Sequence, residues 1–203
     1  MSRRELALRV AGLVGEEQLT LDDPADGWPA LGRVFGPDGP IGIALYVAPV
    51  GLSHRGRDDV ERRFQNPGRD RPIRSIEGKA LVYLGVWEAD PHGEPAPVVL
   101  VTADAYLRVG RRTRASVFPR LDSLLIARKA GIDIAKTTTG EEIVAFVPEL
   151  LPALVHAQTI AVSPNEVRFR QEVLAEVGES SPERRRRIST TLVRANSFAR
   201  SVP

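Results

Sequence analysis

The fold is organised around residues Arg62 to Glu88, which read RRFQNPGRDRPIRSIEGKALVYLGVWE. The first half combines arginine with turn-forming residues: Asn66-Pro67-Gly68 is a strong turn signal, and Pro72 pushes Arg71 towards an extended conformation. The second half, Ala80 to Trp87, is apolar throughout, as expected of a central strand that is covered on both faces. The stretch therefore predicts an arginine-bearing loop that runs directly into a buried strand, which is a common support for binding loops.

Length and composition indicate one globular domain, alone or with a short appendage. The chain has 203 residues, of which 42% are hydrophobic and 27% charged, so it can bury a core of its own. No apolar run approaches the roughly 20 residues that cross a bilayer, and the N-terminal residues lack the apolar core and cleavage site of a signal peptide. We therefore expect a cytoplasmic protein that does not contact membranes.

Cysteine is absent from the sequence, which removes disulfides, thiol nucleophiles and cysteine-bound zinc. The three histidines, His54, His92 and His156, lie far apart and in no spacing typical of metal ligands. The sequence therefore predicts no cofactor and no metal site.

Periodic patterns predict an α+β fold with a mixed, mainly antiparallel central sheet of about five to seven strands and flanking helices. A capping box at Ser2 and Glu5 opens a helix over about Arg3 to Val14. Leu19 to Gly39 reads as a packed loop with one short strand at most, anchored by Trp28 and Phe35. The other expected strands are Ile41 to Val50, Ala80 to Trp87, Val98 to Thr102, Arg112 to Phe118, Ile132 to Ala135 and Glu142 to Val147, and the other expected helices are Pro119 to Ala130 and Pro148 to Ala157.

The composition changes near Val162. Ser163-Pro164-Asn165-Glu166 forms a second capping box, and the apolar residues that follow recur at helical spacing. Ser181-Pro182 then begins another helix, which runs to about Ala199. The pattern predicts a globular domain at residues 1–161 and a helical arm at residues 162–203.

Positive charge is carried almost entirely by arginine, and it is clustered. Lysine occurs only at Lys79, Lys129 and Lys136. Five arginines and no acid lie between Tyr106 and Arg120, and six arginines and no acid lie between Arg184 and Arg200. Arginine makes bidentate contacts with phosphate and guanine, so this clustering favours DNA as a partner. A GC-rich genome would also explain the preference for arginine over lysine.

The predicted DNA contacts are arginines in turn-like segments. In Arg108 to Arg114, Gly110 would let the main chain approach a phosphate, although a solvated charged turn is the other interpretation. Aromatic rings near these loops could hold an extruded or modified base, although aromatic residues in strands usually belong to the core. The predicted DNA-binding residues are Arg55, Arg57, Arg63, Arg69, Arg71, Arg108, Arg111, Arg112 and Arg114, and the predicted base or modification pocket is formed by Phe64, Tyr83, Trp87 and Tyr106.

A catalytic alternative starts from Glu77-Gly78-Lys79. Together with an upstream aspartate it is similar to the arrangement of metal-dependent nucleases, in which two carboxylates hold the metal ion and a lysine helps to activate water. That motif lies within a strand, whereas a glycine interrupts it here, so a turn followed by an ion pair at the strand edge competes with it. The upstream candidates are Asp58, Asp59 and Asp70.

Four segments together resemble the N-terminal region of bacterial HNH restriction endonucleases. They are Arg63 to Gly68 (RFQNPG), Leu84 to Trp87 (LGVW), Arg108 to Ser116 (RVGRRTRAS) and Thr139 to Pro148 (TGEEIVAFVP), in a region that covers about Tyr46 to Leu154. The tail, Arg184 to Pro203, resembles the basic helix that precedes the nuclease domain in such proteins. The sequence has no HNH motif, so the resemblance does not extend to cleavage.

The resemblance implies a targeting module, which in modification-dependent members of that family recognises methylated or otherwise modified DNA. We therefore expect residues 1–161 to form a DNA-recognition domain and residues 162–203 to form an arm that leads to a nuclease domain outside this chain. The expected partner is double-stranded DNA that carries a modification, and the chain could form a homodimer. A small metal-dependent nuclease stays open as an alternative, as does a regulatory protein whose arginine-rich tail binds an acidic surface.

Overall fold

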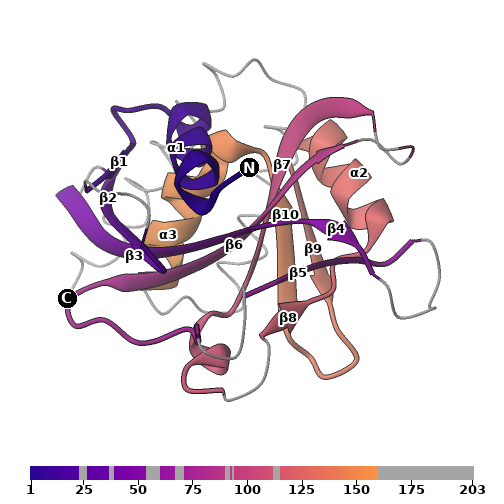
Figure 1. The fold of residues 1–203 in the computed structure, drawn as a ribbon. Helices are drawn as coiled ribbons and strands as arrows, with labels where there is room; N and C mark the ends of the chain where they lie inside the picture. The colour runs from indigo at the N-terminus through magenta and orange to yellow at the C-terminus, as the bar shows by residue number, and fades with distance from the viewer. Residues whose placement is uncertain are drawn as a thin grey trace, which may run out of the picture.

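The computed structural model describes residues 1–22, 27–36, 39–53, 60–66, 71–89, 92, 94–111 and 115–159 (Figure 1). In chain order, with η for 3₁₀-helices, the elements are α1 (Arg3–Val14), β1 (Leu19–Leu21), β2 (Ala30–Gly36), β3 (Gly39–Pro49), β4 (Gly51–Leu52), β5 (Arg62–Gln65), β6 (Ala80–Ala89), β7 (Pro95–Ala103), η1 (Tyr106–Arg108), β8 (Ser116–Val117), α2 (Leu121–Ala130), β9 (Ile132–Lys136), β10 (Glu142–Phe146), η2 (Pro148–Leu150) and α3 (Leu151–Thr159). The predicted α+β fold with a mixed, mainly antiparallel sheet is confirmed.

The main sheet of the described residues has seven strands in the order β1-β2-β3-β6-β7-β10-β9. Its neighbouring strands are antiparallel except for β3 and β6, which run parallel with Tyr46 opposite Tyr83. Parallel neighbours cannot be joined by a tight turn, so the chain between β3 and β6 crosses a face of the sheet. This crossover carries β4 and β5, which form a second, three-stranded sheet with β8. The arginine-rich loop predicted before β6 is thus part of the crossover.

Strand β6 is buried on both faces, as its apolar sequence predicts. Val82 and Leu84 face a core that is covered by α1, η2 and α3. Leu81 and Tyr83 face a second core beneath α2 and the small sheet. Figure 1 shows this arrangement, with α1 and α3 on one side of the sheet and α2 on the other. The small sheet is therefore fixed to the main sheet through an apolar core, which makes it a firm base for the loops at its ends.

The helix and hairpin boundaries follow the capping and turn residues of the sequence. The Ser2 hydroxyl accepts a hydrogen bond from the Glu5 N–H at 3.2 Å, and the Glu5 carboxylate accepts one from the Ser2 N–H at 2.6 Å, which completes the predicted capping box. Helix α2 ends at Gly131, where φ is 92°, a value that favours glycine. The predicted hairpin of β9 and β10 is also present.

The interpretation of Leu19 to Gly39 as a packed loop is wrong, because the segment contains β1 and β2, which pair with each other. Gly32 allows the close approach of the two strands, since a Cβ atom at this position would lie 2.3 Å from the carbonyl oxygen of Thr20. Trp28 packs against the core as predicted, whereas Phe35 is 36% exposed and is not an anchor.

Some predicted elements are shorter or fall on residues that the structure does not describe. The strand expected at Arg112 to Phe118 consists of Ser116–Val117, and residues 112–114 lie outside the described part. Residues 67–70, with most of the predicted turn, and the expected arm at 162–203 also lie outside it. In the part of the chain that is described, no helix has the length and apolar character needed to cross a membrane.

Candidate nucleic-acid interface

A buried asparagine connects the two arginine-bearing parts of the chain. Asn66 is 1% exposed, and its side-chain amide donates to the carbonyl oxygen of Arg71 at 3.0 Å. Its Oδ1 accepts the N–H of Ala115 at 2.8 Å, and its own N–H donates to the Ala115 carbonyl at 3.3 Å. The Trp28 indole N–H also donates to the Arg71 carbonyl at 3.0 Å, and the Tyr83 hydroxyl donates to the Ala115 carbonyl at 2.8 Å. These hydrogen bonds fix the main chain at Arg71, in the first segment, and at Ala115, where the second segment ends.

The second connection lies between the crossover and the segment after η1. The Gly110 N–H donates to the carbonyl oxygen of Ile73 at 3.2 Å, and Gly110 has a φ of 71°. A residue with a Cβ atom would be strained at this φ, so glycine is needed for the chain to turn here. Arg71 and Arg111 are both exposed on these adjoining segments, and the Arg111 Nε–H is held by the Leu107 carbonyl at 2.7 Å. The structure thus brings together two arginines that the sequence predicts as DNA contacts.

The crossover segment after Arg71 is also held against the core by aromatic side chains. The Tyr46 hydroxyl donates to the Arg74 carbonyl at 2.8 Å and accepts the Arg74 N–H at 3.0 Å. The Trp28 ring packs edge-on against Tyr46, with 5.0 Å between ring centroids. Burial raises the pKa of Tyr46, so its hydroxyl stays protonated and keeps its donor. The exposed Arg74 therefore extends from a fixed backbone beside Arg71.

Arg108 is placed differently from the other predicted contacts. Its side chain is 4% exposed and forms a two-pronged ion pair with Glu141, in which the NH2 to Oε2 distance is 3.0 Å. The same guanidinium donates to the Asp104 carbonyl at 2.7 Å. Because the side chain is buried and both terminal nitrogens donate to protein acceptors, Arg108 supports the loop rather than presenting a cation at the surface.

The remaining predicted arginines belong in sequence to a strand of the small sheet or to the segments next to its strands. Arg63 is half-buried on β5. Gln65 of β5 pairs with Ser116 of β8, so the segment after β5 and the segment before β8 start at the same end of this sheet. In the sequence, Arg69 belongs to the segment after β5, and Arg112 and Arg114 belong to the segment before β8. Arg55 and Arg57 belong to the connection between β4 and β5. All five arginines lie outside the described residues.

Of the aromatic residues predicted to form a base pocket, Phe64, Tyr83 and Trp87 lie in the core. The rings of Phe64 and Tyr83 are 4.9 Å apart, and the Arg128 guanidinium carbon lies 4.0 Å from the centroid of the Trp87 ring. Their position agrees with the other interpretation given for them, that aromatic residues in strands belong to the core. Base stacking by these three rings stays a prediction and would require them to leave the core.

Tyr106, the fourth predicted pocket residue, is 57% exposed on η1 and lines a cavity of about 490 Å³. The hydroxyl oxygen of Tyr106 accepts the N–H of Leu81 at 3.4 Å. The cavity lies between η1, the adjoining ends of β7 and β10, strand β9 and α3. Its walls are mainly aliphatic, with polar groups at Thr102, Asp104, Glu141, Glu142 and Gln158.

The residues of the catalytic alternative form a turn. The Lys79 N–H donates to the Ile76 carbonyl at 3.1 Å, and Gly78 has a φ of 68°. Glu77 is exposed, and Asp58, Asp59 and Asp70 lie outside the described residues. Among the residues that are described, no group of three or more His, Cys, Asp or Glu side chains could hold a metal ion. The turn of the competing interpretation is present, but no ion pair joins Glu77 or Lys79 to another described residue, and the nuclease hypothesis itself stays untested.

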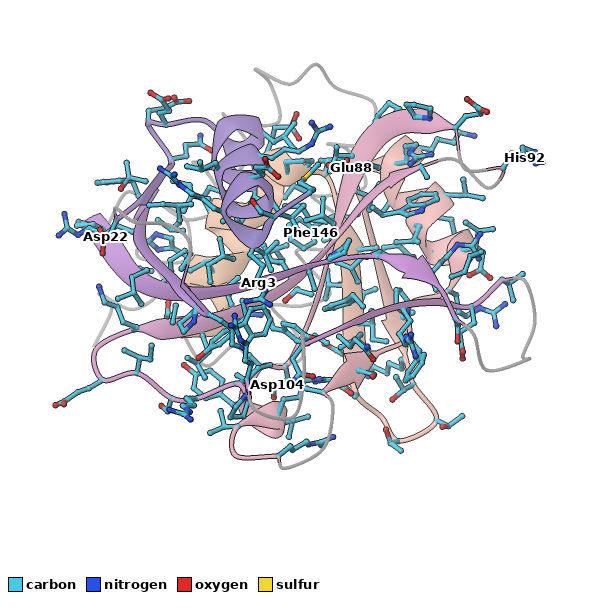
Figure 2. The ribbon with its side chains drawn as sticks, viewed as in Figure 1. Arg3, Asp22, Glu88, His92, Asp104 and Phe146 are labelled. Atoms are coloured by element: carbon cyan, nitrogen blue, oxygen red, sulfur yellow. The ribbon has the colours of Figure 1, made fainter. Side chains whose placement is uncertain are left out.

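Sequence reasoning missed Asn66 as a connecting residue and Arg3 and Arg74 as neighbours of the predicted contacts. Asn66 carried a turn signal in the sequence, but its partner Ala115 is 49 residues away, so no local pattern indicates their hydrogen bonds. Arg3 was interpreted only as the start of a helix. Figure 2 shows Arg3 at the start of α1, and its guanidinium carbon lies 5.7 Å from the centroid of the Trp28 ring.

Comparison with known proteins gives a family but no characterised relative. Residues 41–155, more than half of the chain, match the family model of methylase-associated X1 domains, the kind of domain found with restriction–modification systems. Neither the curated proteins nor the solved structures include a match. The matched region begins in β3 and ends in α3, so it contains the whole crossover, the Asn66 hydrogen bonds and most of the residues that line the Tyr106 cavity. The chain therefore belongs to the methylase-associated X1 family.

Proposed function

We propose that this protein is a DNA-binding specificity module that reads modified double-stranded DNA for a restriction endonuclease and does not itself cleave DNA. The family match supports a role within a restriction–modification system. The resemblance to HNH restriction endonucleases supports a nuclease of that class, carried by a separate domain or chain, as the partner that cuts.

The observation that carries the proposal is the joining of two arginine-bearing segments at Asn66 and Gly110. Arg71 and Arg111 extend from main chain that is held by hydrogen bonds from Asn66 and from Gly110. A guanidinium on a fixed backbone loses less conformational freedom when it binds, and its planar donors match the oxygens of a phosphate. Several such groups on adjoining segments suit a ligand with regularly spaced phosphates, and double-stranded DNA is such a ligand.

The cavity beside Tyr106 supplies the site that would distinguish a modified base. Its volume of about 490 Å³ lies in the range of small-molecule sites, and its aliphatic walls and exposed ring suit the faces of a nucleobase. Arg111 is held by the carbonyl of Leu107, the residue after Tyr106, so a phosphate contact and a base contact would come from one short segment. The same segment would then both position the DNA and read it.

The testing experiment compares the affinity of the protein for duplexes of one sequence that are unmodified or carry methylcytosine, hydroxymethylcytosine or methyladenine. We expect binding to every duplex, because phosphate contacts are independent of sequence, and tighter binding to at least one modified duplex. Equal affinity for the whole panel would contradict modification reading, and an absence of duplex binding would contradict the proposal as a whole.

A second arm of the experiment separates the module from the nuclease alternative. The protein is incubated with a labelled duplex and Mg²⁺, and the DNA is examined for cleavage. We expect a bound but intact duplex. Cleavage that disappears in both Glu77→Gln and Lys79→Ala variants would favour the metal-dependent nuclease instead.

A further inference from the structure

The positive surface beside the crossover continues onto α1, which carries none of the predicted contacts. Arg3 lies over the Trp28 ring, and the Trp28 indole donates to the Arg71 carbonyl, so one indole contacts both arginine residues. A guanidinium over an indole is held by cation–π attraction, which limits the positions it can take. The same aromatic side chain therefore contacts the guanidinium of Arg3 and the main chain of Arg71.

The charges of these two arginines are not compensated within the described part of the chain. Neither Arg3 nor Arg71 forms an ion pair with a described carboxylate. Burial, and next the positive charge of Arg71, lower the pKa of Arg3, so the two guanidinium groups repel each other. An anion placed between two like charges removes that repulsion, and the pair thus favours an anionic ligand.

A hollow beside Arg3 gives such a ligand room. It has a volume of about 670 Å³ and is lined by the first four residues of the chain, by Val47, Ala48 and Pro49 at the end of β3, and by Gln65 of β5. Gln65 contributes a neutral amide that can donate to an anionic oxygen. The hollow lies against β5, the strand that leads to Asn66, and so adjoins the same surface as the predicted DNA contacts.

We propose that Arg3, which lines this hollow, binds a phosphate of the DNA backbone there with Arg71 nearby, which makes α1 part of the DNA-binding surface. The inference rests on the proposed function and extends it to a residue outside the crossover and outside the region matched by the family. The favoured ligand is a nucleic acid rather than an acidic protein, because Arg74 and Arg111 are also exposed on the adjoining segments and a duplex offers several phosphates at a regular spacing.

The test measures how the affinity for an unmodified duplex depends on salt, using the whole chain. Arg3→Gln removes one charge, and the slope of log K against log salt concentration should become less negative by about 0.9, the value for one phosphate contact. Arg3→Lys keeps the charge and should restore the slope. Lys129→Gln, which removes one exposed charge from α2, is the matched control and should leave the slope unchanged. Circular dichroism checks that each variant is folded.

Trp28 provides a readout at the site itself. Binding of the duplex should change the emission of Trp28, whereas the buried Trp87 contributes a constant background, and Arg3→Gln should diminish that change. Polyglutamate serves as the competing polyanion. If it displaces the duplex at an equal concentration of charge, an acidic protein surface is the better ligand and the inference is overturned.

The outcomes separate this inference from the proposed function. If Arg71→Gln and Arg111→Gln flatten the salt dependence but Arg3→Gln does not, the inference about Arg3 fails while the proposed function stands. If the wild-type protein binds no duplex at all, both fail.

Discussion

At the scale of single residues, Asn66 joins the two arginine-bearing segments. Its amide is fully buried and satisfies a carbonyl in one arginine-bearing segment and an N–H in the other. A buried polar group that loses its partner costs more free energy than the bond contributes when it is made. The arrangement of both segments should therefore depend on this one side chain.

Asn66→Ala should lower the free energy of unfolding by about 1–3 kcal/mol, because the N–H of Ala115 loses its acceptor in the interior. Urea denaturation measures the change, and Gln158→Ala, which removes an exposed amide from α3, is the control and should stay within about 0.5 kcal/mol of the wild type. An Asn66→Ala variant as stable as the control would show that the two segments are held together by other contacts.

Arg108 allows a structural role to be separated from a binding role. Arg108→Met leaves Glu141 largely buried without its counter-charge, and the loss of one partner of a buried pair costs about 3–5 kcal/mol. We expect this loss in urea denaturation, and a large recovery in the double variant Arg108→Met with Glu141→Leu. The salt dependence of DNA binding should not change in the folded double variant. A flatter salt dependence would instead support the phosphate contact that the sequence predicts for Arg108.

At the scale of secondary-structure elements, the small sheet is seated on the main sheet at a glycine. Gly85 of β6 lies beneath Phe64 of β5, and a Cβ atom at Gly85 would come within 2.6 Å of both the Phe64 ring and the Val50 side chain. The close approach of β5 to β6 therefore requires the absence of a side chain at this position. Because β5 leads directly to Asn66, this packing also determines how the arginine-bearing segments are positioned relative to the main sheet.

Gly85→Ala should destabilise the protein by about 1–3 kcal/mol, as expected for an added methyl group in a packed core. The duplex affinity should fall as well, since the displaced β5 carries the segments with it. Gly51→Ala is the matched control, because a Cβ atom at Gly51 meets no atom within 4 Å. Equal denaturation midpoints for the two variants would mean that β5 can shift without cost.

The elements were predictable where a local pattern determines them. The apolar run of β6 and the capping box of α1 gave both elements with nearly their observed bounds. β2 was missed because its two glycines weaken the strand pattern, and its pairing depends on the fit of Gly32 against Thr20. The site was predictable to the same extent: turn and charge signals indicate arginine-bearing loops, but the contacts that join them are non-local and leave no local signal.

At the scale of the whole molecule, the position of the candidate interface follows from the topology. Placing β3 and β6 side by side in parallel forces the intervening chain across the sheet, and the arginine-bearing segment lies at the end of that crossover. The segment after η1 joins it through Gly110, while the Tyr106 cavity opens beyond η1 at the ends of β7 and β10. Affinity for DNA would then come from the arginines, and discrimination of the modified base from the neighbouring Tyr106 cavity. Substitutions in one group should therefore leave the contribution of the other unchanged.

Arg111→Glu should weaken the binding of modified and unmodified duplexes by the same factor and flatten the salt dependence, because a phosphate contact carries no information about the base.

Tyr106→Ala should weaken only the preferred modified duplex, by the roughly 1–3 kcal/mol that stacking of a base on an aromatic ring contributes. Leu125→Ala, which shortens an exposed apolar side chain on α2, is the control for Tyr106 and should leave both affinities unchanged. Dissociation constants for the four proteins with both duplexes decide the matter. A Tyr106→Ala variant that loses affinity equally for both duplexes would place the reading site away from this cavity, whereas a selective loss would locate discrimination on η1 and affinity on the arginines beside it.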